Sequence, residues 1–154
     1  MRLRVYRPED CAAMAALFYD TVHTINRRDY SPAQLDAWAT GTVNLAQWNE
    51  RFLTSRTLVA EADGVLIGFG NMDAGGYLDM LYVHRDYQRQ GVARALCDAL
   101  EGESQAARFS THASITARPF FERRGYRTIR AQQVERQGVL LTNFLMEKER
   151  SGNV

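Results

Sequence analysis

Residues 81–93 read Leu-Tyr-Val-His-Arg-Asp-Tyr-Gln-Arg-Gln-Gly-Val-Ala, the pattern of a strand, a polar loop and the start of a helix. A helix start exposes unpaired N–H groups and the positive end of the helix dipole, which together bind phosphate. Gly91 lets the backbone approach such a ligand, the small Ala93 leaves it room, and Arg89 and Arg94 can add charge-assisted hydrogen bonds. The loop therefore predicts a pyrophosphate site, although a simple turn would also explain Gly91.

On either side of this loop, the hydrophobic periodicity alternates between strands and helices. Strands are expected at 2–7, 57–62, 65–72, 77–83, 108–112, 126–130 and 139–148, and helices around 14–25, 32–38, 44–54, 91–100 and 115–124. Ser31 and Pro32 fit the N-cap and first position of a helix, and Asp63-Gly64 fits a hairpin turn. This order predicts an α/β fold in which a mixed sheet of six or seven strands carries helices on both faces.

Length and composition exclude several classes of protein. The 154 residues fit one domain spanning 1–154, and 19 basic against 18 acidic residues leave a charge of +1, which disfavours a nucleic-acid or membrane coat. No run of 18 apolar residues and no signal-peptide pattern occurs, so a cytoplasmic protein is expected. Two cysteines are too few for a disulfide scaffold or structural zinc, and no metal is expected. Neither a P-loop nor a G-x-G-x-x-G dinucleotide motif is present.

Two segments together resemble a known family. Residues 81–93 resemble motif A of the GNAT superfamily of acyl-CoA-dependent N-acetyltransferases, whose signature is Arg/Gln-x-x-Gly-x-Gly/Ala after a strand. Residues 114–126, Ser-Ile-Thr-Ala-Arg-Pro-Phe-Phe-Glu-Arg-Arg-Gly-Tyr, resemble motif B, and residues 29–38 resemble a subgroup of small bacterial members. The predicted element order is also similar to that of the family, so the resemblance covers nearly the whole chain.

The resemblance implies a binding mode for acetyl-CoA. In the family, the fourth strand (here 77–83) bulges and splays from the fifth (here 108–112), and pantetheine pairs with the exposed strand edge. An N–H near Met80 or Leu81 would face the oxyanion. The implied cofactor-binding residues are Leu81, Tyr82, Val83, Gln88, Arg89, Gln90, Gly91, Val92, Ala93, Arg94, Ser114, Phe120 and Phe121.

The acid and the base of the reaction each have more than one candidate. Many family members carry a tyrosine acid four residues before the motif B glycine, but Phe121 stands there and has no proton to give. An alkylamine has a pKa near 10 and must lose a proton before it attacks. Asp79, on the splayed strand, is the first candidate for the base or for an anchor of the substrate ammonium. His112 is a second candidate base, with hydrogen bonding at a strand end as the alternative role. Tyr82 and Tyr126 are candidate substitutes for the acid, with aromatic packing around the strands as the alternative.

These observations lead to a prediction of function. The chain is expected to move an acetyl group from acetyl-CoA to a primary amine of a small molecule, by direct attack in a ternary complex. Acceptor contacts are expected from Tyr30, Trp38, Tyr77 and Asp79, although aromatic residues there also suit packing. The alternatives are a non-catalytic acyl-CoA-binding module and an enzyme acting on a protein lysine or N-terminus. Edge strands near the C-terminus make a homodimer possible.

Overall fold

One mixed sheet organises residues 1–150, which are the residues that the structure, a computed structural model, describes. Its seven strands follow the order β1-β2-β3-β4-β5-β7-β6, and all neighbours are antiparallel except β4 and β5. The strands are β1 (Arg2–Val5), β2 (Arg56–Ala62), β3 (Val65–Met72), β4 (Tyr77–Val83), β5 (Arg108–Ser114), β6 (Arg127–Arg136) and β7 (Val139–Glu149). The expected mixed sheet is confirmed.

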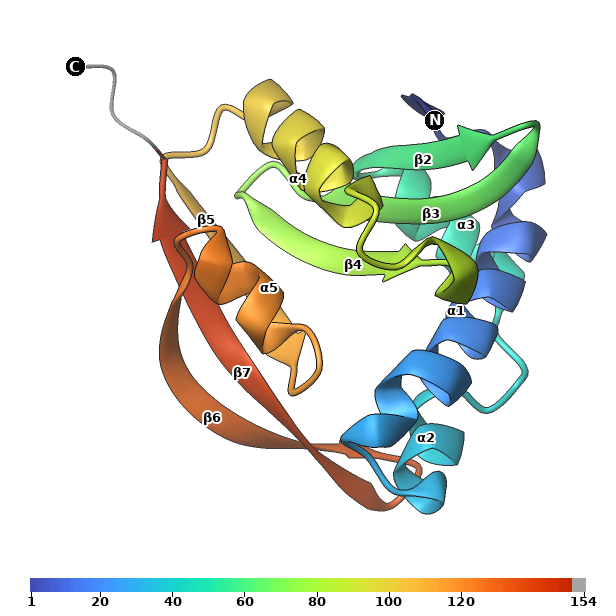
Figure 1. The fold of residues 1–154 in the computed structure, drawn as a ribbon, viewed down its shortest axis with the longest axis vertical. Helices are drawn as coiled ribbons and strands as arrows, with labels where there is room; N and C mark the ends of the chain where they lie inside the picture. Colours follow the sequence, from blue (N-terminus) through green and yellow to red (C-terminus); the bar gives the residue numbers. More distant parts are fainter. Residues whose placement is uncertain (151–154) are drawn as a thin grey trace.

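Helices cover both faces of this sheet. On one face lie α4 (Val92–Glu103) and α5 (Arg118–Arg123), both in front of the sheet in Figure 1. On the other face lie α1 (Cys11–Ile25), α2 (Pro32–Trp38) and α3 (Leu45–Leu53). Each face buries its own apolar cluster, because strand side chains alternate between the two faces. Ser31 caps α2 and Pro32 opens it, as the sequence predicts.

The sheet divides where β4 meets β5. Only Tyr77–Ser110 and Leu78–Thr111 are paired between these strands, which then diverge (Figure 1). Opposite this point, β3 pairs Asn71 with Met80 and Met72 with Leu78, so Asp79 is the extra residue of a bulge. A bulge bends its strand and increases the local twist, which turns β4 away from β5. The predicted splay is therefore present.

Two groups of contacts bridge the halves of the divided sheet. On the α4–α5 face, Glu101 of α4 accepts hydrogen bonds from Lys148 of β7 and from the hydroxyl of Tyr126, and Arg124 pairs with it at 3.0 Å. On the opposite face, the Tyr30 hydroxyl donates to the Thr142 carbonyl at 2.6 Å and accepts from Ile115 N at 2.9 Å. These contacts fix the opening angle from both sides.

Several predicted elements differ from the structure in their bounds, and two of these differences bear on the site. Strand β6 continues to Arg136, whereas the sequence predicts a strand only at 126–130. The prediction is too short because residues 131–136 are mostly polar, as suits a strand at the exposed edge of the sheet. Helix α5 covers only 118–123 rather than 115–124, because β5 runs on to Ser114 and a turn follows it. Longer β6 and β7 strands form a hairpin that curves toward α2 (Figure 1).

Gly76 fixes the point from which β4 and β5 diverge. Its φ is +85°, and a Cβ at this position would lie 2.3 Å from the Arg108 carbonyl oxygen. Gly76→Ala should therefore lower the free energy of unfolding by about 2 kcal/mol or more, from backbone strain and the clash together. The neighbouring Gly75→Ala is the control, since its nearest contact would be 3.4 Å. Equal denaturation midpoints for the two variants would contradict this role.

Candidate active site

The free edge of β4 offers backbone groups to a ligand. Met80 N donates to Asn71 Oδ1 at 3.1 Å and His84 N donates to the Ile67 carbonyl at 2.7 Å, both toward β3. Because the backbone direction alternates along a strand, the N–H and C=O groups of Leu81 and Val83 face the side where β5 has diverged. Of the two N–H groups proposed for the oxyanion, the one of Leu81 therefore remains available and the one of Met80 does not.

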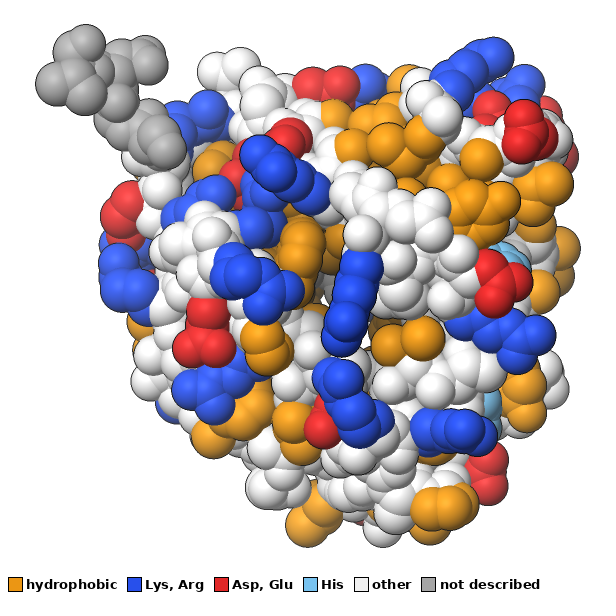
Figure 2. Space-filling view, viewed as in Figure 1, with side chains coloured by type: hydrophobic (Ala, Val, Ile, Leu, Met, Phe, Trp, Pro, Cys, Tyr) orange, Lys and Arg blue, Asp and Glu red, His pale blue; other side chains and the backbone are white. Residues whose placement is uncertain are grey.

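The loop after β4 has the geometry of an anion site. Gln88 Nε2 donates to the Val83 carbonyl at 2.7 Å, which anchors the loop to the strand. Gly91 is the N-cap of α4 with a φ of +83°, and nothing lies within 4 Å of where its Cβ would be. Arg89 and Arg94 are exposed on either side of it. Figure 2 shows basic side chains beside the hollow between the two halves of this face. These features fit a pyrophosphate group.

The three motif B positions differ in their surroundings. Ser114 Oγ accepts a hydrogen bond from Ala117 N at 3.0 Å, so this hydroxyl supports the turn before α5. Phe121 is 3% exposed and packs edge-on against Tyr126 with 5.1 Å between ring centroids. Phe120 is partly exposed beside it. Cofactor contacts of Ser114 and Phe121 stay predictions, and both residues also have a clear structural use.

Asp79 lies in a network of hydrogen bonds at the β4 bulge. Arg51 of α3 binds both of its carboxylate oxygens, and Asn71 Nδ2 donates to the same carboxylate at 3.2 Å. Asn71 is buried, and it also donates to Ser55 Oγ at 3.1 Å. The carboxylate is therefore held firmly, and accepting a proton would weaken its ion pair with Arg51.

His112 lies on the same face, next to Tyr77. The Tyr77 hydroxyl is 3.0 Å from His112 Nδ1, and no hydrogen bond engages Nε2 within residues 1–150. Burial lowers the pKa of His112 below its ordinary value of 6.5, and the charges of Arg130 and Arg136 lower it further. A neutral imidazole with a free nitrogen is what a general base requires at pH 7.

The aromatic candidates are mostly packed. Burial raises the pKa of Tyr82 above its ordinary value, with an interaction with Trp38 opposing it, and its ring packs edge-on against Phe18. Tyr82 is thus a weaker proton donor than an exposed tyrosine. Tyr30 is 6% exposed with its hydroxyl occupied, and it packs edge-on against the partly exposed Trp38. Trp38 is the more accessible of these two candidates for an acceptor contact.

Sequence reasoning does not find four polar residues around Asp79 and His112. Arg51 lies 28 positions from Asp79 on a helix, and Asn71 is hidden in an apolar strand. Arg130 faces His112 across β7, and Arg136 joins the same face only because β6 is longer than expected. Asn71 is the one of these residues that the sequence could have indicated, since a polar residue in an apolar strand needs a hydrogen-bonding partner when it is buried.

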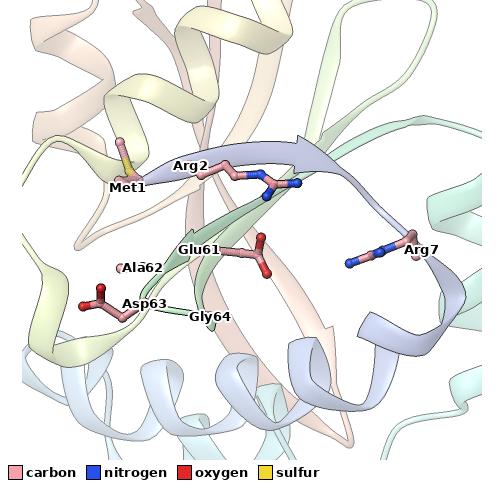
Figure 3. Close-up of a pocket in the computed structure, with 7 residues that line it drawn as sticks. All are labelled: Met1, Arg2, Arg7, Glu61, Ala62, Asp63 and Gly64. Carbon is pink, nitrogen blue, oxygen red and sulfur yellow. The ribbon is translucent and has the colours of Figure 1, made fainter.

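Other features of the described residues lie elsewhere. A pocket of about 520 Å³ at the β1 edge is lined by residues of β1, Arg7 and the β2–β3 turn (Figure 3), and none of them belongs to β4 or β5. No group of acidic, histidine and cysteine side chains suited to a metal occurs among residues 1–150. No helix in that part of the chain is both long and apolar enough to cross a membrane.

Comparisons with known proteins identify the family. The family model described as "Acetyltransferase (GNAT) domain" matches residues 26–149. The uncharacterized N-acetyltransferase YafP of Escherichia coli (strain K12) is 38% identical over 147 residues, which are 95% of this chain and 94% of that protein. A crystal structure described as a GCN5-related N-acetyltransferase, aminotransferase class-II, from Rhodopseudomonas palustris has a TM-score of 0.92 and 36% identity, covering 96% and 94% of the two chains.

A more distant structure shares the fold. The PaiA N-acetyltransferase from Thermoplasma acidophilum in complex with coenzyme A has a TM-score of 0.75 at 15% identity, covering 96% of this chain and 98% of its own. Family match, close relatives and the divided sheet agree, and the chain therefore belongs to the GNAT family and is an acyltransferase of the N-acetyltransferase type.

Proposed function

We propose that the protein transfers the acetyl group of acetyl-CoA to a primary amine of a small molecule, by direct attack in a ternary complex. The observation that carries this proposal is the free edge of β4 at Leu81 and Val83, which leads directly to the phosphate loop at Gly91. One ligand that carries both an amide-containing arm and a pyrophosphate would use both features.

Acetyl-CoA is the cosubstrate. The PaiA structure contains coenzyme A, and a further structure of this fold, yncA from Salmonella typhimurium, contains acetyl-CoA (TM-score 0.69, 19% identity, covering 100% of this chain and 96% of its own). Acetyl-CoA supplies an activated acetyl group on a thiol whose pKa is near that of free cysteine, about 8.5. The CoA thiolate can therefore leave without help from a strong acid. This property suits a chain with Phe121 in place of the usual tyrosine.

His112 is the proposed base. Its free Nε2 can take the proton of the acceptor ammonium, while Nδ1 stays bonded to the Tyr77 hydroxyl and keeps the ring in place. Asp79 is proposed as a fixed negative charge that attracts the ammonium rather than as the proton acceptor, because Arg51 and Asn71 occupy its oxygens. Tyr82 stays a weaker candidate acid because of its buried hydroxyl.

Direct attack and a small acceptor have separate support. Cys11 and Cys97 are both buried, and burial raises the pKa of the Cys97 thiol to about 12, so neither suits an acetyl-cysteine route. On the acceptor side, Tyr30 and Gln34 bind carbonyls of β7, which closes one end of the region near Trp38. A closed end favours a small amine over a protein chain.

Cellular context and assembly stay predictions. A single domain, a cytoplasmic location and a possible homodimer are consistent with the sequence. The unpaired edge of β6 is the surface on which a second copy would add most simply.

The phosphate loop can be tested with a pair of variants at one position. Gly91→Glu and Gly91→Gln share the strain of a positive φ and differ only in charge. We expect the KM for acetyl-CoA to be about tenfold higher in the glutamate variant, because its carboxylate repels pyrophosphate. Thermal melting of both proteins controls for folding. Equal KM values would remove the loop from the binding site.

The base can be tested by its pH dependence. The lowered pKa of His112 means that its neutral form predominates above a midpoint below 6.5, so kcat/KM should fall as the pH drops through that midpoint. His112→Gln should abolish this fall, the acidic limb of the pH profile, and should lower kcat/KM roughly 10²-fold. His23→Gln is the control, since His23 binds the Ala39 carbonyl away from the site and should keep the limb.

The same measurement distinguishes whether Asp79 anchors the ammonium or acts as the base. Asp79→Asn should raise the KM for the amine by about tenfold, since a fixed charge is lost, and should leave the acidic limb in place. Loss of the limb in Asp79→Asn, together with its retention in His112→Gln, would instead make Asp79 the base.

A further inference from the structure

The face that carries His112 has more positive charge than the chain itself neutralises. His112 of β5 pairs across the sheet with Leu145 of β7, and Leu145 pairs with Arg130 of β6. Directly opposed residues point to the same face, so Arg130 lies on the His112 side. Tyr77 of β4 pairs with Ser110, two residues before His112 on β5, and its hydroxyl lies 3.0 Å from His112 Nδ1 on the same face.

Arg136 ends β6 at the turn of the hairpin, and alternation along the strand puts it on the same face as Arg130. Burial and the charges of Arg130 and Arg136 lower the pKa of His112. Burial raises the pKa of Tyr77, and the charge of Arg136 opposes that rise. In the described part of the chain, neither arginine has a carboxylate within 4.0 Å, and Arg136 bonds only to the Glu135 carbonyl, at 3.1 Å. Both side chains are exposed, so each can turn toward a ligand.

The nearby carboxylates interact with groups other than Arg130 and Arg136. Asp79 is held by Arg51, Asp73 accepts from the backbone N–H groups of Gly75 and Tyr77, and Glu147 lies 3.9 Å from Arg108. A plain alkylamine could place its ammonium near Asp79, but it would offer nothing to Arg130 and Arg136, whose charges no carboxylate within 4.0 Å offsets in residues 1–150. An acceptor with its own negative group would pair with them, because a guanidinium binds a carboxylate or phosphate in a charge-assisted fork.

We propose that the acceptor is an amine that also carries an anionic group, a carboxylate or a phosphate, which Arg130 and Arg136 bind while His112 receives the proton of the amine. This inference rests on the proposed function and deepens it by naming the class of acceptor. Specificity then comes from the β6–β7 hairpin, and the reaction stays that of the family.

Matched amines test the proposal on the purified full-length protein. With acetyl-CoA, kcat/KM is measured for β-alanine against β-alaninamide and for phosphoethanolamine against ethanolamine, and product masses confirm acetylation. We expect the anionic member of at least one pair to be preferred about tenfold or more. The pair that discriminates identifies carboxylate or phosphate as the recognised group.

The two arginines are tested together. Arg130→Gln/Arg136→Gln should reduce the preference to about one, through a loss of kcat/KM for the anionic amine. The acidic limb should also move to higher pH, because two charges that lower the pKa of His112 are removed. Arg2→Gln/Arg7→Gln, in the pocket of Figure 3, changes the net charge equally at the far edge of the sheet and should retain the preference.

The outcomes separate this inference from the function on which it rests. Acetylation of neutral and anionic amines at equal kcat/KM by the wild-type protein would overturn the inference and leave the function standing. A preference that survives in Arg130→Gln/Arg136→Gln would overturn the role of the arginines. Acetylation of no amine at all would overturn the proposed function as well.

Discussion

The short pairing between β4 and β5 determines how the two halves of the sheet are arranged. Two residue pairs join the strands, and the bulge at Asp79 then turns β4 away. A regular sheet would satisfy the backbone of Leu81 and Val83 with β5 and leave no edge for a ligand. The division therefore leaves the N–H and C=O of Leu81 and the N–H of Val83 without a partner on β5, whereas the Val83 carbonyl already accepts from Gln88 and Thr21. The proposed cosubstrate would pair with the open groups.

A divided sheet must be stabilised by contacts other than strand pairing. Glu101, Arg124 and Lys148 join α4 to α5 and β7 on one face, and Tyr30 joins the segment before α2 to β5 and β7 on the other. Both groups are largely buried, so breaking either one leaves polar atoms without partners. Tyr30 thus has a structural role at a position where the sequence also suggests a substrate contact.

How much could be predicted from the sequence depends on the range of each interaction. The geometry of the loop at Gly91 was predictable because Gly91 and the helix after it are adjacent in the chain, and the splay followed from the family resemblance. The binding of phosphate by this loop stays a prediction. The partners of Asp79 could not be predicted, because Arg51 comes from a helix 28 residues away and no local pattern links the two residues. Strand β6 was predicted too short because an exposed edge strand needs few apolar residues, and the positive charge near His112 was missed with it.

The bulge also explains how one strand serves both substrates. Without an extra residue, alternation would put Leu78 and Met80 on one face, yet Leu78 packs in the α4 cluster and Met80 in the α1 cluster. The inserted Asp79 shifts the alternation, so the residues before and after it are set independently. The start of β4 can then present Tyr77 to His112, while its end presents backbone at the edge where we propose that acetyl-CoA binds. On this proposal, changes in the hairpin would alter the acceptor without disturbing that edge.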